Sequence, residues 1–450
     1  MREPAVAGLF YPADPLALRA AVADHVDDAP DPHPDAEPRA LIAPHAGYRY
    51  SGATAGVAYR AVAARRDRVE RVVLVGPAHR VAVGGAGVGV STARAWRTPL
   101  GDVPVDVDAC RRLVADGLAV EADRAHAPEH SVEVHLPFVL EVVGPVPVVP
   151  LVVGRGRATA VAAALRGAWD GDATLVVVSS DLSHYLPEDE ARVRDQRTRW
   201  SIVEDRPGDI GPYDACGFAA VTGLMLAARQ RGLAPRTLAV TTSAAVSGDA
   251  TRVVGYGSFS FEPSRPLAPA DGAWLVARAR SAIAHELATG ELDPLGDTGV
   301  PEQLRRPGAS FVTLEHRGSL AGCIGTLEAA RPLWVDVARN ARGAALADPR
   351  FPPLDRADLD DVTVKVSVLS PLEPLPVAGR DDLVAAVAPG VDGVLVESGD
   401  HRGTFLPVVW AKVPEPERFV AALLAKAGLP AGEWPEGTLA WRYATDDVAG

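Results

Sequence analysis

Six of the eleven histidines fall in four short segments of the first half of the sequence. His45 lies in APHAGYRYSG, His79 lies in VGPAHR, and SSDLSHY carries Asp181 with His184 three residues later. The fourth segment, HAPEHSVEVH, contains His126, Glu129, His130 and His135. Imidazole is the commonest protein ligand for borderline metal ions. This concentration of imidazoles therefore indicates a metal site, although the spacing alone does not name the metal.

Each of these segments follows a predicted strand or lies in a loop. Four short apolar runs have the pattern of strands buried on both faces, namely ALIAP (40–44), RVVLVGP (71–77), VPVVPLVVG (146–154) and ATLVVVSSD (173–181). In an open α/β sheet, ligands bind beyond the carboxyl ends of the strands. We therefore expect His45, His79, Asp181 and His184 to converge at one edge of the sheet.

Cys216 is the candidate anionic ligand. Two imidazoles and one anionic ligand leave coordination positions open for a substrate or for oxygen. Cys216 stands in GPYDACGFAA, where Gly217 opens a predicted helix, and a thiol near a helix N-terminus and a metal is readily deprotonated. Taken singly, each residue has a structural alternative, a hydrogen-bonded loop histidine or a small buried cysteine. Their concentration in one half of the chain favours a site.

The first half of the chain alternates predicted strands with predicted helices. The helices are expected at 53–66, 108–118, 158–169 and 217–232, and VVGYGSFSF (253–261) is expected to be a last strand. Such alternation is typical of an α/β domain with a mainly parallel sheet flanked by helices. We place this domain at residues 1–262.

The pattern changes after EPSRPLAPADG (262–272), a segment rich in proline and small residues that indicates a linker at 263–271. An amphipathic helix is expected at 272–290. Strand pairs follow at 309–327, 361–372 and 393–410, with the turn signals HRGS and GDHRG. We therefore expect residues 272–450 to form a smaller α+β domain with antiparallel strands, in keeping with a chain of 450 residues.

Composition excludes several classes of function. The net charge of −13, with no basic stripe, argues against nucleic-acid binding. The N-terminal sequence does not resemble a signal peptide, and no apolar run approaches the ~20 residues of a membrane span. Three widely separated cysteines give no disulfide pattern, which is typical of a reducing compartment. We expect a soluble cytoplasmic protein without a membrane partner.

A set of motifs spanning residues 2–258 resembles the Memo family, also called AmmeMemoRadiSam system protein B. The motifs are REPAVAGLFYP, LIAPHAGYRYSG, VGPAHR, EHSVEVHLPF, SSDLSHY, DACGF and VVGYGS, in the order of that family. The resemblance implies the fold of class III extradiol dioxygenases, which bind non-haem iron(II) through two His and one Glu, with Cys in place of the carboxylate. It implies His45, His79 and Cys216 as metal ligands. Asp181, His184, Glu129 and His130 are implied to line the same pocket.

The second half of the chain resembles the AMMECR family, AmmeMemoRadiSam system protein A, over about 271–446. The matching stretches include FVTLEHRGSLAGCIGTLEAARPL, NARGAALADPRFPPL and HRGTFLPVVW. That family usually has Arg where this chain has Ala321, and Arg317 or Arg402 is a candidate replacement. Cys323 is a candidate nucleophile, but Gly322 and Ile324 beside it favour a packed core cysteine. Cys110 lies in a helical pattern and is expected to be structural.

Two functions follow from these resemblances. The first is a metal-dependent, dioxygenase-like redox enzyme that acts on a small organic substrate. It would use iron(II), with copper or zinc as alternatives because thiolate is a soft ligand, and His184 would be the acid/base, oriented by Asp181. The second is a non-catalytic regulatory protein that holds a metal or a peptide in the same cleft. The system to which the two families belong implies a radical SAM protein as a partner.

Overall fold

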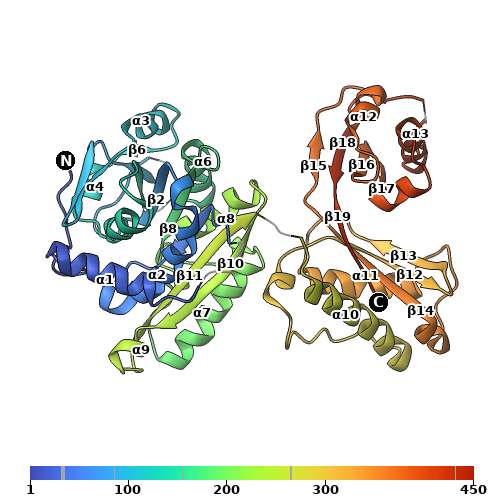
Figure 1. Cartoon of the computed structure of the whole chain (residues 1–450), viewed down its shortest axis with the longest axis horizontal. Helices are drawn as coiled ribbons and strands as arrows, with labels where there is room; N and C mark the ends of the chain where they lie inside the picture. Colours follow the sequence, from blue (N-terminus) through green and yellow to red (C-terminus); the bar gives the residue numbers. More distant parts are fainter. Residues whose placement is uncertain (32–35, 86, 155, 264–265, 431) are drawn as a thin grey trace. The chain divides into compact units, whose positions relative to one another are not determined.

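The computed structural model describes residues 1–31, 36–85, 87–154, 156–263, 266–430 and 432–450. The chain divides into two compact units, residues 1–264 and 265–450, and each is described here by itself (Figure 1). Residues 264 and 265 of the expected linker lie outside the described residues. Helix α10 (Pro269–Thr289) begins inside that expected linker. Independent folding of the two units stays a prediction.

A nine-stranded sheet forms the centre of the first unit, in the order β10-β11-β1-β8-β2-β7-β3-β6, with β9 paired to β11. Its four central strands are β1 (Ala40–Ala43), β8 (Thr174–Ser179), β2 (Arg71–Pro77) and β7 (Val148–Val153). They run parallel and are almost entirely buried, because helices cover both faces of runs that are apolar on both sides. The four strands predicted from the sequence are confirmed.

The outer strands make the sheet mixed. β11 (Val253–Pro263) is antiparallel to β1 and to the edge strand β10 (Leu233–Thr242). The short strand β9 (His184–Leu186) also pairs with β11. At the other side β3 (Val88–Val90) is antiparallel to β7 and parallel to β6 (Val120–Glu121). β10 was not predicted, because it contains Pro235 and follows directly on a helix. An edge position tolerates proline, which lacks a donor for a second neighbour.

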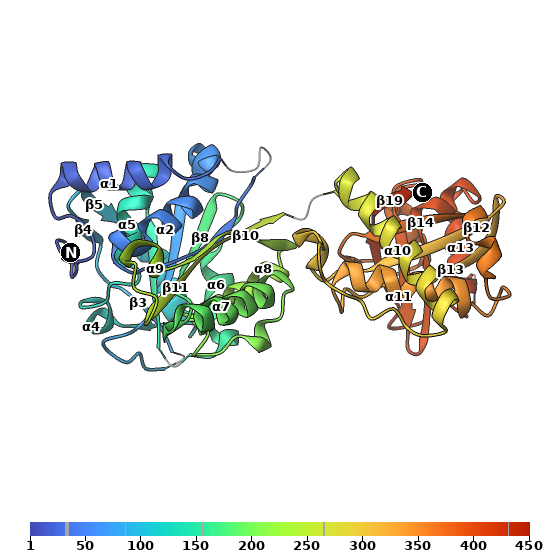
Figure 2. The same ribbon diagram turned by 90° about the horizontal axis from the view of Figure 1, so that it is seen from below.

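Helices cover the sheet on both faces. Figure 2 shows α1 (Pro15–Asp27) and α2 (Tyr48–Val62) on one face, and α6 (Ala158–Ala168), α7 (Glu188–Val203) and α8 (Phe218–Arg229) on the other. The remaining elements are α3 (Val107–Ala115), α4 (Asp123–His126), α5 (Leu136–Phe138), α9 (Ala244–Ser247), η1 (Ala63–Arg68), η2 (Glu133–His135), η3 (Val139–Val143), η4 (Pro207–Asp209) and the hairpin β4 (Ala95–Thr98) and β5 (Gly101–Pro104). Among the described residues, no helix combines the length and the apolar character needed to cross a bilayer.

A buried carboxylate, Glu133, fastens the N-terminal segment to this unit. It pairs with the guanidinium of Arg2 and accepts hydrogen bonds from Ala5 N (2.7 Å), Val6 N (3.0 Å) and the Tyr11 hydroxyl (2.6 Å). Arg2 also donates to the carbonyl oxygen of Glu129 at 2.6 Å. Arg2 and Glu133 are both nearly excluded from solvent, so each needs the other to offset the loss of hydration.

Replacing Glu133 by alanine is expected to lower the free energy of unfolding of the first unit by ~3–5 kcal/mol, because the Arg2 charge stays buried without a carboxylate to neutralise it. The matched control is Glu141→Ala, which breaks the more exposed pair with Arg19 and should cost under ~1 kcal/mol. Urea unfolding of the full chain measures the loss of unfolding free energy in each variant. Hydrogen exchange in peptides from residues 1–264 assigns that loss to the first unit. Equal losses in the two variants would contradict the assignment.

The second unit contains two antiparallel sheets. The first has the order β13-β12-β14-β19, with β12 (Ser310–His316), β13 (Ser319–Gly325), β14 (Val362–Leu369) and β19 (Thr445–Ala449), and it packs against α10 and α11 (Leu333–Leu346). The second has the order β15-β18-β16-β17, with β15 (Glu373–Leu375), β16 (Gly393–Ser398), β17 (His401–Phe405) and β18 (Leu439–Tyr443). It packs with α12 (Arg380–Ala386), α13 (Pro416–Lys426) and η7 (Pro407–Ala411). The short helices η5 (Glu302–Arg305) and η6 (Arg356–Asp361) pack with α11 and α10 instead. The predicted α+β class is confirmed.

Candidate metal centre

Three parallel strands deliver the site residues to one edge of the sheet. His45, His79 and Asp181 are each the second residue beyond the end of β1, β2 and β8. Because β1, β8 and β2 are neighbours and run parallel, these three positions lie side by side. The fourth, His130, comes from the loop between α4 and η2. Its ring packs on that of Phe10, with 4.7 Å between centroids, so the fastened N-terminal segment helps to hold it.

His45, His79 and His130 form a cluster that could hold a metal ion. One nitrogen from each ring lies within 4.8 Å of the others. The ring centroids are 5.1 Å apart for His45 and His79, 5.0 Å for His79 and His130, and 5.5 Å for His45 and His130. The family resemblance implies a place for His130 in the pocket but not among the ligands. His130 does not lie next to a strand, so the expectation that ligands bind beyond the carboxyl ends of strands does not point to it.

The Nδ1 atom of each imidazole in the cluster faces an oxygen. The Ser179 hydroxyl donates to the Ser131 carbonyl, so at 2.6 Å it accepts from His45 Nδ1. His79 Nδ1 and His130 Nδ1 lie 3.0 and 3.2 Å from Glu129 Oε1. A hydrogen on Nδ1 leaves the lone pair on Nε2, which is the arrangement that orients metal-ligating histidines. The donor set therefore fits a metal ion.

Glu129 acts as the common support of His79 and His130. Besides contacting the two rings, its carboxylate accepts hydrogen bonds from the backbone nitrogens of His79 (2.6 Å), His130 (2.9 Å) and Ser131 (3.0 Å). Burial alone would raise the pKa of Glu129, but the hydrogen bonds from His130, His79 and Ser131 outweigh it and hold that pKa far below its usual range. An ionised carboxylate thus positions two of the three imidazoles.

Cys216 lies against the cluster. Its Sγ is 3.3 Å from His45 Nε2 and 3.3 Å from the backbone nitrogen of Asp181, which donates to it. Burial, and then the charge of Asp181, raise the pKa of the Cys216 thiol to about 12. The sulfur is therefore a neutral thiol unless a cation occupies the site. That it becomes a thiolate ligand stays a prediction.

Asp181 and His184 make different contacts from those predicted. The Asp181 carboxylate, which is buried, accepts from the backbone nitrogen of His45 at 2.8 Å. His184 Nδ1 lies 2.8 Å from the Leu182 carbonyl and therefore donates to it. A backbone carbonyl rather than Asp181 thus fixes the tautomer of His184 and leaves its Nε2 free to accept a proton. The next residue, Tyr185, has φ of 60°, a strained backbone conformation of a kind that clusters at functional sites.

The other two histidines of the HAPEHSVEVH segment are structural. His126 Nε2 contacts the Gly89 carbonyl at 3.1 Å and its ring packs on Trp96, while His135 Nδ1 lies 3.2 Å from the Tyr59 hydroxyl. Burial lowers the pKa of His126 to about 4 and that of His135 to about 3. Both are neutral rings of the core.

Comparison with known proteins places this site in a family. The family model for Memo-like proteins matches residues 2–260. The chain belongs to the Memo-like protein family. A MEMO1 family protein of Methanopyrus kandleri is 35% identical over 286 residues, covering 58% of this chain and 98% of the relative. One of Methanothermobacter thermautotrophicus is 35% identical over 283 residues, covering 58% of this chain and 100% of the relative.

The rest of the chain matches a second family model, AMMECR1, over residues 276–448. A protein of Methanothermobacter thermautotrophicus is 42% identical over 168 residues, covering 37% of this chain and 86% of that protein. Among solved structures, an uncharacterized protein of Pyrococcus horikoshii is 32% identical, covering 40% of this chain and 92% of its own, with a TM-score of 0.38.

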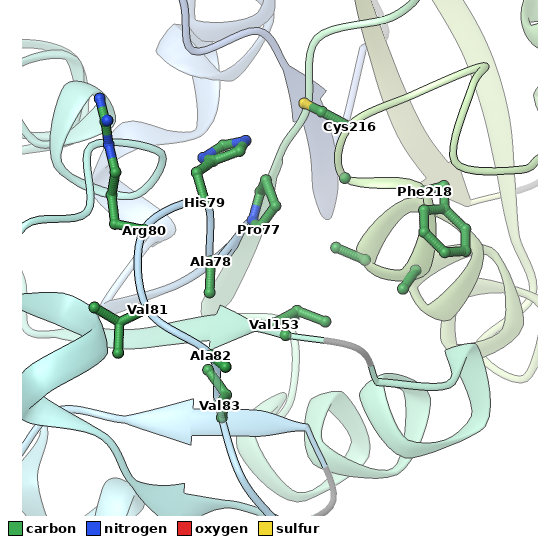
Figure 3. Close-up of a pocket in the computed structure, with 14 residues that line it drawn as sticks. Pro77, Ala78, His79, Arg80, Val81, Ala82, Val83, Val153, Cys216 and Phe218 are labelled. Carbon is green, nitrogen blue, oxygen red and sulfur yellow. The ribbon is translucent and has the colours of Figure 1, made fainter.

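A pocket of about 410 Å³ opens beside the histidine cluster of the Memo-like unit. It is lined by Pro77–Val83, Val153, Gly154 and Cys216–Ala220. In Figure 3, His79 and Cys216 lie at the top of the view, above Val153, Ala82 and Val83, with Phe218 to one side. His79, Arg80 and Cys216 supply its polar side chains, and the other lining residues are apolar or glycine. A pocket of this size with a few convergent polar groups suits a small organic molecule.

Proposed function

We propose that the Memo-like unit is an iron(II)-dependent, dioxygenase-like oxidoreductase that acts on a small organic substrate. One observation carries the proposal: three imidazoles lie close enough to share a metal ion, each with its Nδ1 at an oxygen that fixes the other nitrogen toward the site. The apolar pocket beside them supports a substrate site, because it has room for a ligand next to His79 and Cys216.

The residues present suit iron(II), with copper or zinc as alternatives. Neutral imidazole binds all three ions, and a thiolate from Cys216 would add a softer ligand. Iron(II), when bound, would supply one-electron chemistry and open coordination positions for a substrate and oxygen. His45 is well suited to bind as a neutral ligand, because burial, followed by the charges of His79 and His130, lowers its pKa well below the ordinary value.

The protein itself would orient the substrate and move a proton. The walls formed by Ala82, Val83 and Val153 would exclude water from the bound molecule. His184 is not among the residues that line this pocket, so as an acid/base it would serve a substrate that reaches past the cluster toward Asp181. Its free Nε2 is the group that would accept the proton.

Anaerobic purification tests the proposal. Metal analysis of the full chain should find stoichiometric iron, and oxygen consumption should rise with a member of a panel of catecholic and amidated aromatic compounds. Cys216→Ser is the matched variant for the fourth ligand: it should retain iron but shift its absorption spectrum if the sulfur is bound. Stoichiometric zinc without oxygen consumption would overturn the proposal in favour of a non-catalytic protein that binds a metal or a peptide.

The proposal also keeps a radical SAM protein as a partner, on the strength of the family resemblance. Such a partner would supply the substrate of the metal site or consume its product. Co-purification of the full chain with the radical SAM protein of the same genome tests this part separately from the metal content.

A further inference from the structure

The cysteine and the arginines singled out in the second unit are engaged in structural contacts. The carboxylate of Asp348 accepts from Cys323 N at 2.9 Å, and Arg350 Nη2 donates to the Cys323 carbonyl at 2.8 Å, so a turn after α11 holds this residue. Cys323 is partly exposed and is not the packed core cysteine that the sequence favours. Arg317 and Arg402 are each paired with a carboxylate, at 2.9 and 2.6 Å. These contacts account for the residues without a ligand, whereas the pocket of the first unit has room for one.

The pocket beside the histidine cluster has walls that are fastened to the sheet. The loop after β2 forms one wall, residues 216–220 at the start of α8 form the other, and the end of β7 lies between them (Figure 3). Ala78 N donates to the Val153 carbonyl at 2.8 Å, which ties the beginning of the loop to β7. Farther along, a Cβ built on Gly154 would stand 3.0 Å from the Cβ of Val83. The loop therefore packs closely on the strand end, and the pocket is formed before any ligand binds.

The two ends of this pocket differ in polarity. His79 and Cys216, which lie together in Figure 3, supply polar atoms at the end that adjoins the candidate metal centre. Arg80 belongs to the loop wall, but its side chain extends away from Val153 and Phe218 in the same view. The remaining lining side chains are those of alanine, valine, proline and one phenylalanine. A ligand in the pocket would therefore meet the metal centre at one end and hydrocarbon side chains at the other.

The helix start in the pocket wall does not add a polar site at the hydrocarbon end. Gly217 N donates to Ser180 Oγ at 3.0 Å, and Phe218 N donates to the Ala215 carbonyl at 3.1 Å. Ala220 N donates to the Gly217 carbonyl at 2.8 Å. Nitrogens at such positions can bind phosphate or carboxylate groups, but these three already have partners within the protein. A charged tail would lose its hydration here without gaining bonds from them, whereas an apolar tail would remove apolar surface from water.

We propose that this pocket holds the apolar tail of a small amphiphilic ligand whose polar, metal-chelating head lies at the histidine cluster. This ligand class rests on the proposed metal-dependent function and narrows it, because sugars, nucleotides and phosphate esters have no tail that suits a hydrocarbon wall. A volume of about 410 Å³ is near the lower limit of ligand pockets and suits a short tail. Val83, Val153 and Phe218 would contact the tail and determine its shape. His184 does not line the pocket, so it would act on a different part of the ligand.

Binding of alkyl hydroxamates to the zinc-loaded full chain tests the proposal. Every member of the series has the same chelating head, and the tail lengthens from acetohydroxamate to hexanohydroxamate. Zinc takes the place of iron so that no oxidation accompanies binding. Isothermal titration calorimetry gives the Kd of each member. Each added methylene that is buried in the pocket should raise the affinity by roughly three- to fourfold, so hexanohydroxamate should bind roughly 100-fold more tightly than acetohydroxamate.

Variants of the pocket wall assign the gain in affinity to the pocket. Ala219→Leu places a larger side chain at a buried lining position and should abolish most of the gain, while acetohydroxamate binds as before. Val83→Thr keeps the volume but puts a hydroxyl beside the tail, and should weaken hexanohydroxamate by roughly five- to tenfold. Its matched control is Val193→Thr at an exposed position of α7, which should leave every Kd unchanged. If Ala219→Leu does not fold, Val83→Thr decides the result.

The possible results separate the tail site from the metal centre. If acetohydroxamate binds but hexanohydroxamate is less than roughly threefold tighter, the tail site is overturned and the metal centre stands. A gain that persists in both Ala219→Leu and Val83→Thr has the same meaning, because the tail would then bind elsewhere. A chain that takes up no zinc and binds no hydroxamate overturns the metal centre and the ligand class together.

Discussion

Replacing His79 by alanine is expected to lower the affinity for iron by more than ~100-fold, which is beyond the 10–100-fold that the loss of an outer hydrogen-bond partner costs. The imidazole supplies one of the three nitrogens of the cluster. The variant should stay folded, because the side chain is 30% exposed and Glu129 keeps its bonds to His130 and Ser131. Competition with a chelator of known affinity, followed by metal analysis, measures the loss.

The matched control for His79 is Arg80→Ala, an exposed neighbour in the same pocket wall. Its guanidinium is not a metal ligand, so this variant should retain iron at the level of the unaltered chain. Retention of stoichiometric iron by His79→Ala through the same competition would remove His79 from the ligand set. Loss of iron from both variants would show instead that the loop at 78–83 as a whole shapes the site.

Replacing His184 by glutamine is expected to leave iron bound and to lower turnover by ~10²–10⁴-fold, the usual cost of losing a general acid or base. The amide of glutamine can still donate to the Leu182 carbonyl, but it cannot accept a proton as Nε2 of the imidazole does. The rate of oxygen consumption per iron-loaded molecule, with the compound found in the aromatic panel, gives the effect.

Tyr185→Phe controls for a purely structural effect in the same strand. It removes only the hydroxyl of an exposed side chain and keeps its ring beside His184 and Arg252. Its rate and melting temperature should match those of the unaltered chain. If His184→Gln lowers the melting temperature but not the rate per iron-loaded molecule, His184 braces the loop and takes no part in the reaction.

The fold of the first unit and part of its site could be predicted, because several site residues come directly after buried strands in the sequence. Runs such as ALIA and TLVVVS are apolar on both faces, which marks central parallel strands, and the residues just after them must meet at one edge. His45, His79 and Asp181 met there as expected. The alternation of these strands with helices likewise indicates the α/β class.

The remainder of the site depends on contacts that sequence spacing does not encode. His130 reaches the cluster from a loop held by Phe10, far away in the sequence, and by its neighbour Glu129, which also contacts the distant His79. Ser179 lies within a predicted strand, and nothing in the sequence distinguishes it as a site residue. Its hydroxyl nevertheless orients His45. The bond predicted between Asp181 and His184 failed because backbone groups compete for both side chains at closer range.

In the second unit the hairpins were predictable and the neighbours of Cys323 were not. The turns HRGS and GDHRG set the pairing of β12 with β13 and of β16 with β17. The bond from Arg350 to the Cys323 carbonyl depends on where the loop after α11 returns to β13. That is a tertiary contact between residues 27 positions apart in the sequence.

The turn at Asp348 and Arg350 also bears on solubility. β13 is the edge strand of its sheet, where a row of free N–H and C=O groups invites a strand of another chain to pair and aggregation to begin. At Cys323 both outward groups are already taken, one by a carboxylate and one by a guanidinium. The row is interrupted in its middle, so a second molecule cannot extend the sheet across it. Two charged side chains thereby guard the protein against fibril-like self-association.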